Sequence, residues 1–276
     1  MINILITGCS RGIGFETVKS FSQTADVNIF AISRDVKGLE ILKTECNQIN
    51  NKSTIHSLSI DLSDLDSINN ITSYLKSNLN GTINGVIHNA GYLVKKDFSK
   101  LSLKDLNDSF KINCFAPFIL TQKLIPFLSK NAHVISISSM GGVQNSQKFP
   151  GLSAYSTSKG TLITLTQCLA EEFKTSGLKF NCLALGAVQT EMLDATIRIR
   201  LIEVQARVQE RGGDTIGALN TLQKITTMVV PSTLSWQTAK LSIADIHQRE
   251  GRPQQAQDAL SPLLQERNDD RVRGRA

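Results

Sequence analysis

The segment 7-TGCSRGIG-14 decides how the chain folds. It follows the apolar run 2-INILIT-7 and precedes a segment with helical periodicity, so it is expected to join a strand to a helix. Glycine permits a tight turn and a close backbone approach to a pyrophosphate, and a helix N-terminus offers free N–H groups and a positive dipole end. Glycines also serve ordinary turns, but this position between strand and helix predicts a phosphate-binding loop.

Short β-rich runs alternate with amphipathic segments, such as Asp64–Leu79 and Tyr155–Thr175, through the first 193 residues. The expected strands are Ile2–Thr7, Val27–Ser33, Thr54–Asp61, Gly85–Asn89, His133–Ser138 and Phe180–Gly186. Strands that alternate with helices imply a parallel sheet with right-handed crossovers. Runs that are apolar on both faces, such as NILIT and HVISIS, are typical of a sheet covered on both sides. The sequence predicts an α/β fold, a Rossmann-type doubly wound parallel sheet of about six strands.

Composition narrows the class of protein. The 276 residues are 41% hydrophobic and 20% charged, which is ordinary for a soluble globular chain. No apolar run approaches the roughly 18–20 residues of a membrane span, and the N-terminus lacks the features of a signal peptide, so a cytoplasmic protein is expected. The net charge of +6 is mild and no basic run is interleaved with aromatics. We therefore expect neither a membrane nor nucleic acid as a partner.

Cysteine and histidine positions give no metal-site pattern. The five cysteines are odd in number and contain no CxxC pair, so we expect reduced thiols buried in a core. They are Cys9, Cys46, Cys114, Cys168 and Cys182. The four histidines also lie apart in the sequence, and no metal is expected.

The chain changes character at about Leu193. Residues 1–193 contain 16 Lys and 2 Arg, whereas residues 194–276 contain 2 Lys and 10 Arg. A single domain rarely changes its choice of cation so sharply, so we expect two domains, 1–193 and 194–276. The second part offers only Thr226–Val230 as a candidate strand and is expected to be all-α.

An internal echo with an offset of 38 residues runs through the second part. Its positions are Ala206, Gly213, Ala218 and Leu222, matched by Ala244, Gly251, Ala256 and Leu260. Small residues at fixed intervals are typical of closely packed helix pairs. The pattern loosely resembles tetratricopeptide repeats, whose usual period is about 34 residues; an unrelated helical hairpin is the alternative. A repeat of this kind implies a protein partner or self-association through 194–276.

An ordered set of motifs across the first 190 residues resembles the short-chain dehydrogenase/reductase family. The motifs are Thr7-Gly8-Cys9-Ser10-Arg11-Gly12-Ile13-Gly14, Asp61, Asn89-Ala90-Gly91, Asn113, Ser139, Tyr155-Ser156-Thr157-Ser158-Lys159 and Thr190. One of these could arise by chance, but the ordered set is specific. The resemblance implies an NAD(P)-dependent oxidoreductase with a small carbonyl or alcohol substrate, and a homo-oligomer of unspecified size. Family members usually add a seventh strand, which this sequence lacks.

Tyr155 and Lys159 are four residues apart on an expected helix and therefore share a face. A lysine ammonium beside a phenol favours phenolate, so we expect a lowered pKa for Tyr155 and proton exchange near neutral pH. The family resemblance implies that Ser139 binds the substrate oxygen and that Asn113 helps hold a water beside Lys159. Without that context, a Tyr–Lys pair is an ordinary solvated helix face.

The segment between Ser139 and Tyr155 is about three residues longer than the family usually has. A longer loop costs little free energy, so Ser139 is expected to reach its place. Ser138 and Ser146 are weaker candidates for the same role.

Cofactor contacts are expected at the ends of the strands. Asp61 would bind the adenine amino group, with capping of the next helix as the alternative, and Thr190 would bind the carboxamide, with a helix N-cap as the alternative. The full expected set is Gly8, Ser10, Arg11, Gly12, Ile13, Gly14, Arg34, Asp61, Leu62, Asn89, Ala90, Gly91, Tyr155, Lys159, Gly186, Val188 and Thr190.

Arg11 and Arg34 are the only arginines before residue 194. The expected second strand, NIFAIS, supplies no acidic residue to bind a ribose 2′-hydroxyl, whereas a guanidinium fork suits a 2′-phosphate. We therefore expect NADP(H) to be preferred over NAD(H). The sequence favours a carbonyl reductase similar to 3-oxoacyl reductases, and the alternative is a nucleotide-binding scaffold with a helical interaction tail and little turnover.

Overall fold

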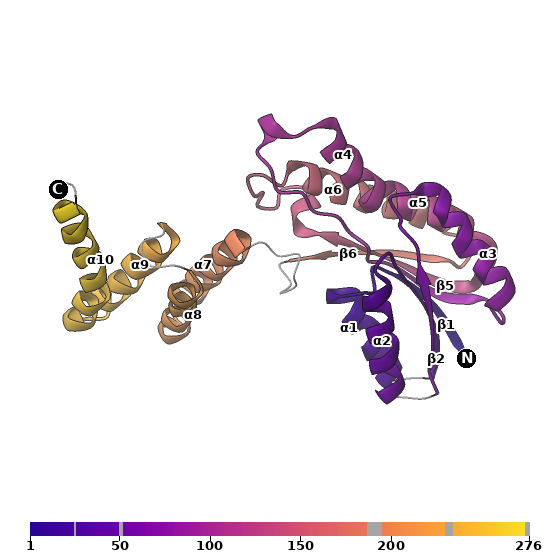
Figure 1. Cartoon of the computed structure of the whole chain (residues 1–276), viewed down its shortest axis with the longest axis horizontal. Coiled ribbons are helices and arrows are strands. Elements are labelled where there is room, and N and C mark those ends of the chain that lie inside the picture. The colour runs from indigo at the N-terminus through magenta and orange to yellow at the C-terminus, as the bar shows by residue number, and fades with distance from the viewer. Residues whose placement is uncertain (25, 50–51, 187–194, 230–233, 274–276) are drawn as a thin grey trace. The chain divides into compact units, whose positions relative to one another are not determined.

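The structure is a computed structural model of the chain that describes residues 1–24, 26–49, 52–186, 195–229 and 234–273 (Figure 1). The chain divides into two compact units, Met1–Met192 and Leu193–Ala276.

The first unit is built on one six-stranded parallel sheet with the strand order β3-β2-β1-β4-β5-β6. The strands are β1 Ile2–Thr7, β2 Val27–Ser33, β3 Thr54–Ser59, β4 Ile83–His88, β5 Leu128–Ser139 and β6 Lys179–Leu185. The α/β class and the Rossmann-type sheet are thus confirmed. The bounds of β1 and β2 are as expected, β3 is two residues shorter than expected, and β5 begins five residues earlier.

Helices cover both faces of this sheet (Figure 1). They are α1 Gly12–Thr24, α2 Val36–Ile49, α3 Ile68–Asn78, α4 Leu103–Phe110, α5 Ala116–Leu124 and α6 Ser153–Glu172. Side chains along one strand alternate between two cores: Ile4 and Ile6 of β1 pack with residues of α1 and α2, while Leu5 packs with residues of α3 and α5. This double burial is why the strands read as continuously apolar.

The sheet order reverses between β1 and β4. From β1 the chain proceeds outward to β2 and β3, then crosses back to β4 and continues to β5 and β6. The loops after β1 and β4 therefore leave the sheet side by side in opposite directions, at the carboxyl ends of the strands. Open α/β sheets bind ligands at this topological switch point.

In the second unit, the described residues 195–229 and 234–273 form four helices. They are α7 Ala195–Arg211, α8 Thr215–Met228, α9 Leu234–Arg249 and α10 Pro253–Arg273. The described part of this unit is helical, as expected. Of the candidate strand, Thr226–Met228 belong to the end of α8, whose Ile225 is fully buried in the helical core, and Val230 lies outside the described residues. Apolar contacts between the helices thus outweigh the preference of the β-branched and apolar residues in that short run for a strand.

The 38-residue echo falls on equivalent places in the second unit. The buried members of the echo share one core and are Ala206, Ala218, Leu222, Ala244 and Ala256. Gly213 and Gly251 follow α7 and α9 with φ values of 82° and 70°, a left-handed conformation that glycine adopts readily at helix ends. The tetratricopeptide assignment stays a prediction.

Two further expectations concern single residues and membranes. Burial of the cysteines is found for Cys9, Cys46 and Cys114, but Cys168 is exposed because it lies on the solvent side of α6, and Cys182 is half-buried.

Among the described helices, none is long and apolar enough to cross a membrane.

Candidate active site

Hydrogen bonds join the end of β1 to the end of β4. The Thr7 hydroxyl oxygen accepts the backbone N–H groups of Asn89 and Ala90, both at 3.0 Å. In return, Asn89 Nδ2 donates to the carbonyl oxygens of Thr7 at 3.0 Å and Gly8 at 3.1 Å. The two loops at the switch point are therefore fastened to each other.

The glycine loop fits this junction so tightly that side chains are excluded. Gly8 and Gly12 have positive φ values of 73° and 60°. A Cβ on Gly14 would collide with the Gly8 carbonyl oxygen and lie 2.5 Å from Asn89 Nδ2. Because α1 begins at Gly12, its first N–H groups have no partner within the helix. This combination of free donors and absent side chains fits a pyrophosphate.

The loop is also held from the side of β2. Ser33, the last residue of β2, donates its hydroxyl to Ser10 Oγ at 2.9 Å. A Cβ on Gly38 of α2 would lie 2.6 Å from Ser10 Cβ. The loop thus has its shape set from three sides before any ligand binds. Ile13 is half-buried in the first turn of α1, and Arg11 is exposed in the loop.

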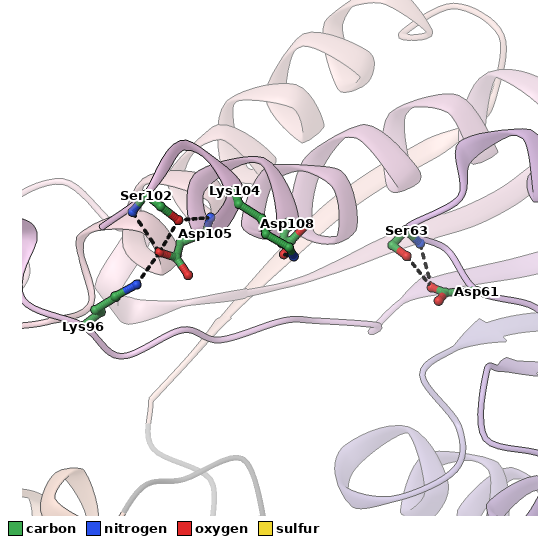
Figure 2. A network of polar contacts seen from close by, with 7 residues as sticks. All are labelled: Asp61, Ser63, Lys96, Ser102, Lys104, Asp105 and Asp108. Carbon is green, nitrogen blue, oxygen red and sulfur yellow. Dashed lines mark hydrogen bonds and ion pairs between the residues drawn. The ribbon is translucent and has the colours of Figure 1, made fainter. Parts of the chain in front are cut away.

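Residues after β2 and β3 form the expected adenine side. Arg34 is exposed directly after β2. Asp61 lies two residues beyond the end of β3, and its Oδ1 accepts the N–H and hydroxyl of Ser63 at 2.9 and 2.8 Å (Figure 2). Burial acts to raise the pKa of Asp61, but these bonds and the charge of Arg34 hold that pKa below its ordinary value. The side chain of Leu62 packs in the hydrophobic core instead of at the surface.

Ser139, Tyr155 and Lys159 meet where β5 and α6 converge. Ser139 is the last residue of β5, and a hydrogen bond joins its hydroxyl to the phenol of Tyr155 in the first turn of α6. Lys159 lies one turn further along the helix and is 3% exposed. Its Nζ donates to the carbonyl oxygen of Ile137 at 2.8 Å and lies 5.9 Å from the centroid of the Tyr155 ring.

The expected lowering of the Tyr155 pKa is wrong. Burial raises the pKa of the phenol, and only the hydrogen bond with Ser139 opposes that effect. Burial likewise lowers the pKa of Lys159 to about 8, with a partly opposing effect of Cys182. Desolvation disfavours the charged form of both groups, and the ammonium is directed to a backbone carbonyl instead of the phenol oxygen.

The three candidate serines have different places. Ser138 is 3% exposed and donates to the carbonyl oxygen of Lys159 at 2.8 Å. Ser146 lies on the loop after β5 and donates to the carbonyl oxygen of Val143 at 2.9 Å. Ser139 is the serine joined to Tyr155.

Asn113 is a connector between three segments. It lies in the π-helical turn η3, Lys111–Phe115, between α4 and α5, a feature frequent at functional sites. Its Oδ1 accepts the N–H of Tyr92 at 2.8 Å, and its Nδ2 donates to the Tyr92 carbonyl oxygen at 2.8 Å and to Ser158 Oγ at 2.9 Å. A Cβ on Gly91 would lie 3.5 Å from Lys159 Nζ, so Asn113 holds the segment that passes the lysine.

Comparison with known proteins agrees with this geometry. Residues 3–198 match the short chain dehydrogenase family. The chain belongs to the short-chain dehydrogenase family. The match extends from β1 past the end of the sheet into the first residues of α7.

Two curated relatives share less than a third of their residues with this chain over the matched regions. The chain is 28% identical over 194 residues to a 3-amino-tetrahydro-pyrrolizinone reductase of Xenorhabdus hominickii, covering 70% of this chain and 63% of that protein. It is 30% identical over 207 residues to Protein FixR of Bradyrhizobium diazoefficiens, covering 72% of this chain and 71% of that protein. The chain thus spans less than two thirds of the first of these relatives.

A solved short-chain dehydrogenase from Shigella flexneri, complexed with NADP, superimposes with a TM-score of 0.62 at 27% identity. The superposition covers 69% of this chain and 79% of the Shigella protein.

In the present chain, a second polar network braces the segment after β4 (Figure 2). Lys96 Nζ donates to Asp105 Oδ2 at 2.7 Å, and Ser102 and Asp105 form a reciprocal cap at the start of α4. The hydrogen bond from Lys96 and, to a lesser extent, those from Ser102 hold the pKa of Asp105 well below its ordinary range. The Lys96 N–H donates to the carbonyl oxygen of Gly151 at 3.0 Å. The network therefore connects α4 to the loop that leads into Tyr155.

Some expected residues are not placed, and some placed residues were not expected. Gly186 follows β6 and is exposed, whereas Val188 and Thr190 lie outside the described residues. Thr7 and Ser158 act through hydrogen bonds that spacing alone does not predict, although both lie inside the quoted motifs.

The junction of β1 and β4 leads to a stability prediction. Thr7→Val keeps the shape of the side chain but leaves the N–H groups of Asn89 and Ala90 without their acceptor. We expect a loss of about 1–3 kcal/mol in the free energy of unfolding, measured by urea denaturation. Thr24→Val is the matched control at an exposed helix end and should change stability by less than about 0.5 kcal/mol. Equal effects of the two variants would contradict the role of Thr7.

Proposed function

We propose that the protein is an NADPH-dependent reductase that converts a ketone or aldehyde to an alcohol. The observation that supports this proposal best is the meeting of Ser139, Tyr155 and Lys159 at the carboxyl end of β5, on a sheet whose β1–α1 loop fits a pyrophosphate. 3-Oxoacyl thioesters are the proposed substrate class.

The residues of the site have distinct parts in this reaction. Tyr155 donates its phenolic proton to the substrate oxygen, while the Ser139 hydroxyl aligns that oxygen and stabilises the charge that develops on it. Lys159 provides a positive charge beside the tyrosine, and Asn113 keeps the segment around Gly91 in place against that lysine. When bound, the nicotinamide supplies the hydride. The tyrosine recovers its proton from solvent by way of the lysine.

The burial of Tyr155 and Lys159 suits proton donation by the tyrosine. Burial raises the pKa of the Tyr155 phenol, so the phenol stays protonated, as a proton donor must. As the proton leaves, the adjacent ammonium of Lys159 stabilises the phenolate that forms. The lysine thus acts on the product of proton transfer more than on the resting tyrosine.

Preference for NADPH is proposed from the charges near the end of β2. Arg34 is exposed there, and the forked geometry of its guanidinium suits a 2′-phosphate. Arg11 lies in the facing glycine loop and adds positive charge on the same side. The nearby carboxylate of Asp35 accepts the N–H of Gly38 at 3.2 Å at the start of α2. The NADP bound by the Shigella flexneri protein supports the same choice of cofactor.

A second candidate function is a nucleotide-binding scaffold whose helical unit recruits a protein. The separate core of α7–α10 favours this alternative. Binding of NADPH with no turnover of any carbonyl compound would favour it over the reductase.

Arg34→Ala tests the cofactor proposal. Loss of the guanidinium should raise the Kd for NADPH about 10- to 100-fold, as expected for one charge-assisted contact, and should leave the Kd for NADH nearly unchanged. Fluorescence titration measures both constants. Lys37→Ala, which removes an exposed cation three residues away, is the control. An equal loss of affinity for both dinucleotides would contradict the 2′-phosphate contact.

Tyr155→Phe tests the reductase proposal. We expect native protein to oxidise NADPH with at least one member of a panel of ketones and 3-oxoacyl thioesters, and the variant to lose this turnover by at least about 10³-fold. The Kd for NADPH should change less than about twofold, because only the proton donor is removed. A native protein that binds NADPH without turning over the panel refutes the reductase proposal.

The pH dependence of reduction follows from Lys159. Its pKa of about 8 means that the ammonium is lost as pH rises through that value. The kcat for reduction should therefore be constant below about pH 7 and fall above about pH 8. Stopped-flow rates at saturating NADPH would measure this profile. A rate that rises through pH 8 would contradict the assigned role of the ammonium.

A further inference from the structure

The loop that follows β5, residues 140–148, closes on itself. Met140–Gly142 form the 3-10 turn η5. The N–H of Val143 donates to the carbonyl oxygen of Met140 at 3.1 Å, and the N–H of Ser146 donates to that of Val143 at 3.4 Å. Asn145 has a φ of 62°, a conformation that asparagine tolerates better than most residues.

Lys148 fastens this loop with its ammonium group. Nζ donates to the carbonyl oxygens of Gly141 at 2.9 Å and Val143 at 2.5 Å, and to Ser146 Oγ at 2.9 Å. All three donors of the ammonium thus have a partner within seven residues. Because these three bonds lie within residues 140–148, the Lys148 ammonium stabilises the conformation of its own loop.

The hydrogen bonds made by Lys148 and Ser146 are connected to Ser139 through one peptide group. The hydroxyl of Ser146 faces the carbonyl oxygens of both Met140 and Val143 and shares its one proton between them. The Met140 carbonyl belongs to the same peptide group as the Gly141 N–H, which donates to Ser139 Oγ at 3.2 Å. Because a peptide group is planar, the orientation of the C=O sets the direction of the N–H. With its oxygen engaged as an acceptor, Ser139 keeps its own proton for the bond to Tyr155.

Close packing against α6 leaves this turn little freedom. A Cβ on Gly141 would lie 2.9 Å from Ser156 Oγ, and one on Gly142 would lie 2.6 Å from the backbone nitrogen of Gly160. The turn therefore touches α6 at two places, Ser156 and Gly160, both within about a turn and a half after Tyr155. Because the Gly141 N–H is bound to Ser139 Oγ, the orientation of the Met140–Gly141 peptide group bears directly on the serine hydroxyl.

We propose that Lys148 and Ser146 are positioning residues that orient the Ser139 hydroxyl toward Tyr155. Successive hydrogen bonds polarise one another, so the lysine charge also strengthens the bond that reaches the serine. The catalytic consequence rests on the proposed reductase function, whereas the structural link from Lys148 to Ser139 does not. Ser146, a candidate for the catalytic role from its position in the sequence, supports Ser139 in this proposal.

Amide hydrogen exchange tests the structural link without any turnover. In Lys148→Met and in Ser146→Ala, the Gly141 amide should exchange at least about tenfold faster than in the native protein, because its peptide group is no longer held. Lys148→Arg keeps the charge and donors and should restore most of the protection. Lys174→Met removes an exposed lysine that binds Glu171 and should change nothing. Unchanged exchange at Gly141 in Lys148→Met overturns the proposal.

Steady-state kinetics test the positioning role. Lys148→Met should lower kcat about five- to tenfold with the KM for NADPH unchanged. The double variant Ser139→Ala/Lys148→Met should be no slower than Ser139→Ala alone, because the lysine acts only through that serine. Additive losses overturn the positioning role, as does an unchanged kcat in Lys148→Met. A native protein without turnover refutes the reductase instead, and the exchange experiment then decides the link by itself.

Discussion

Thr7 and Asn89 connect the end of β1 to the end of β4 by four hydrogen bonds, and the glycine loop and the segment around Gly91 both take their positions from that junction. The two strands are neighbours because the sheet order reverses between them. Each loop satisfies the polar groups of the other, so neither needs a ligand to keep its shape. This prior order lowers the free-energy cost of binding a dinucleotide across the switch point.

Desolvation and polarity are balanced differently on the two sides of the candidate site. Beyond the end of β3, Asp61 keeps its charge because Ser63 and Arg34 compensate for burial. On the side of Tyr155 and Lys159, burial disfavours both charged forms. The same burial requires that the groups be oriented by hydrogen bonds, which the loop after Ser139 supplies.

The two compact units differ in how they gain stability. In the first unit, the parallel sheet buries apolar side chains on both faces, and long-range contacts dominate. In the second, helices adjacent in the sequence pack on each other through small residues at equivalent positions. The shift from lysine to arginine near residue 193 coincides with this change in architecture. Family similarity reaches residue 198, so the dehydrogenase match ends close to the start of the helical unit.

The sequence by itself determined the order of strands and helices, the α/β class, the glycine loop and the motifs that place the chain in its family, because these depend on local periodicity and on residues close in the chain. It predicted β1 and β2 to the residue. It left Thr226–Val230 open as a candidate strand, and contacts with other helices decided that α8 extends into this run. It failed at Cys168, whose exposure depends on which face of α6 meets the sheet.

Only the tertiary structure decided which serine reaches Tyr155, that Asn113 binds Tyr92 and Ser158, and that Lys148 clamps the loop beside Ser139. These contacts join residues whose spacing follows no fixed period, so no pattern in the sequence encodes them. The direction of the Tyr155 pKa was also a tertiary property. A lysine four residues away predicts a lowered value, but the measure that matters is how much water the fold removes from the phenol, and this depends on every element that packs around it.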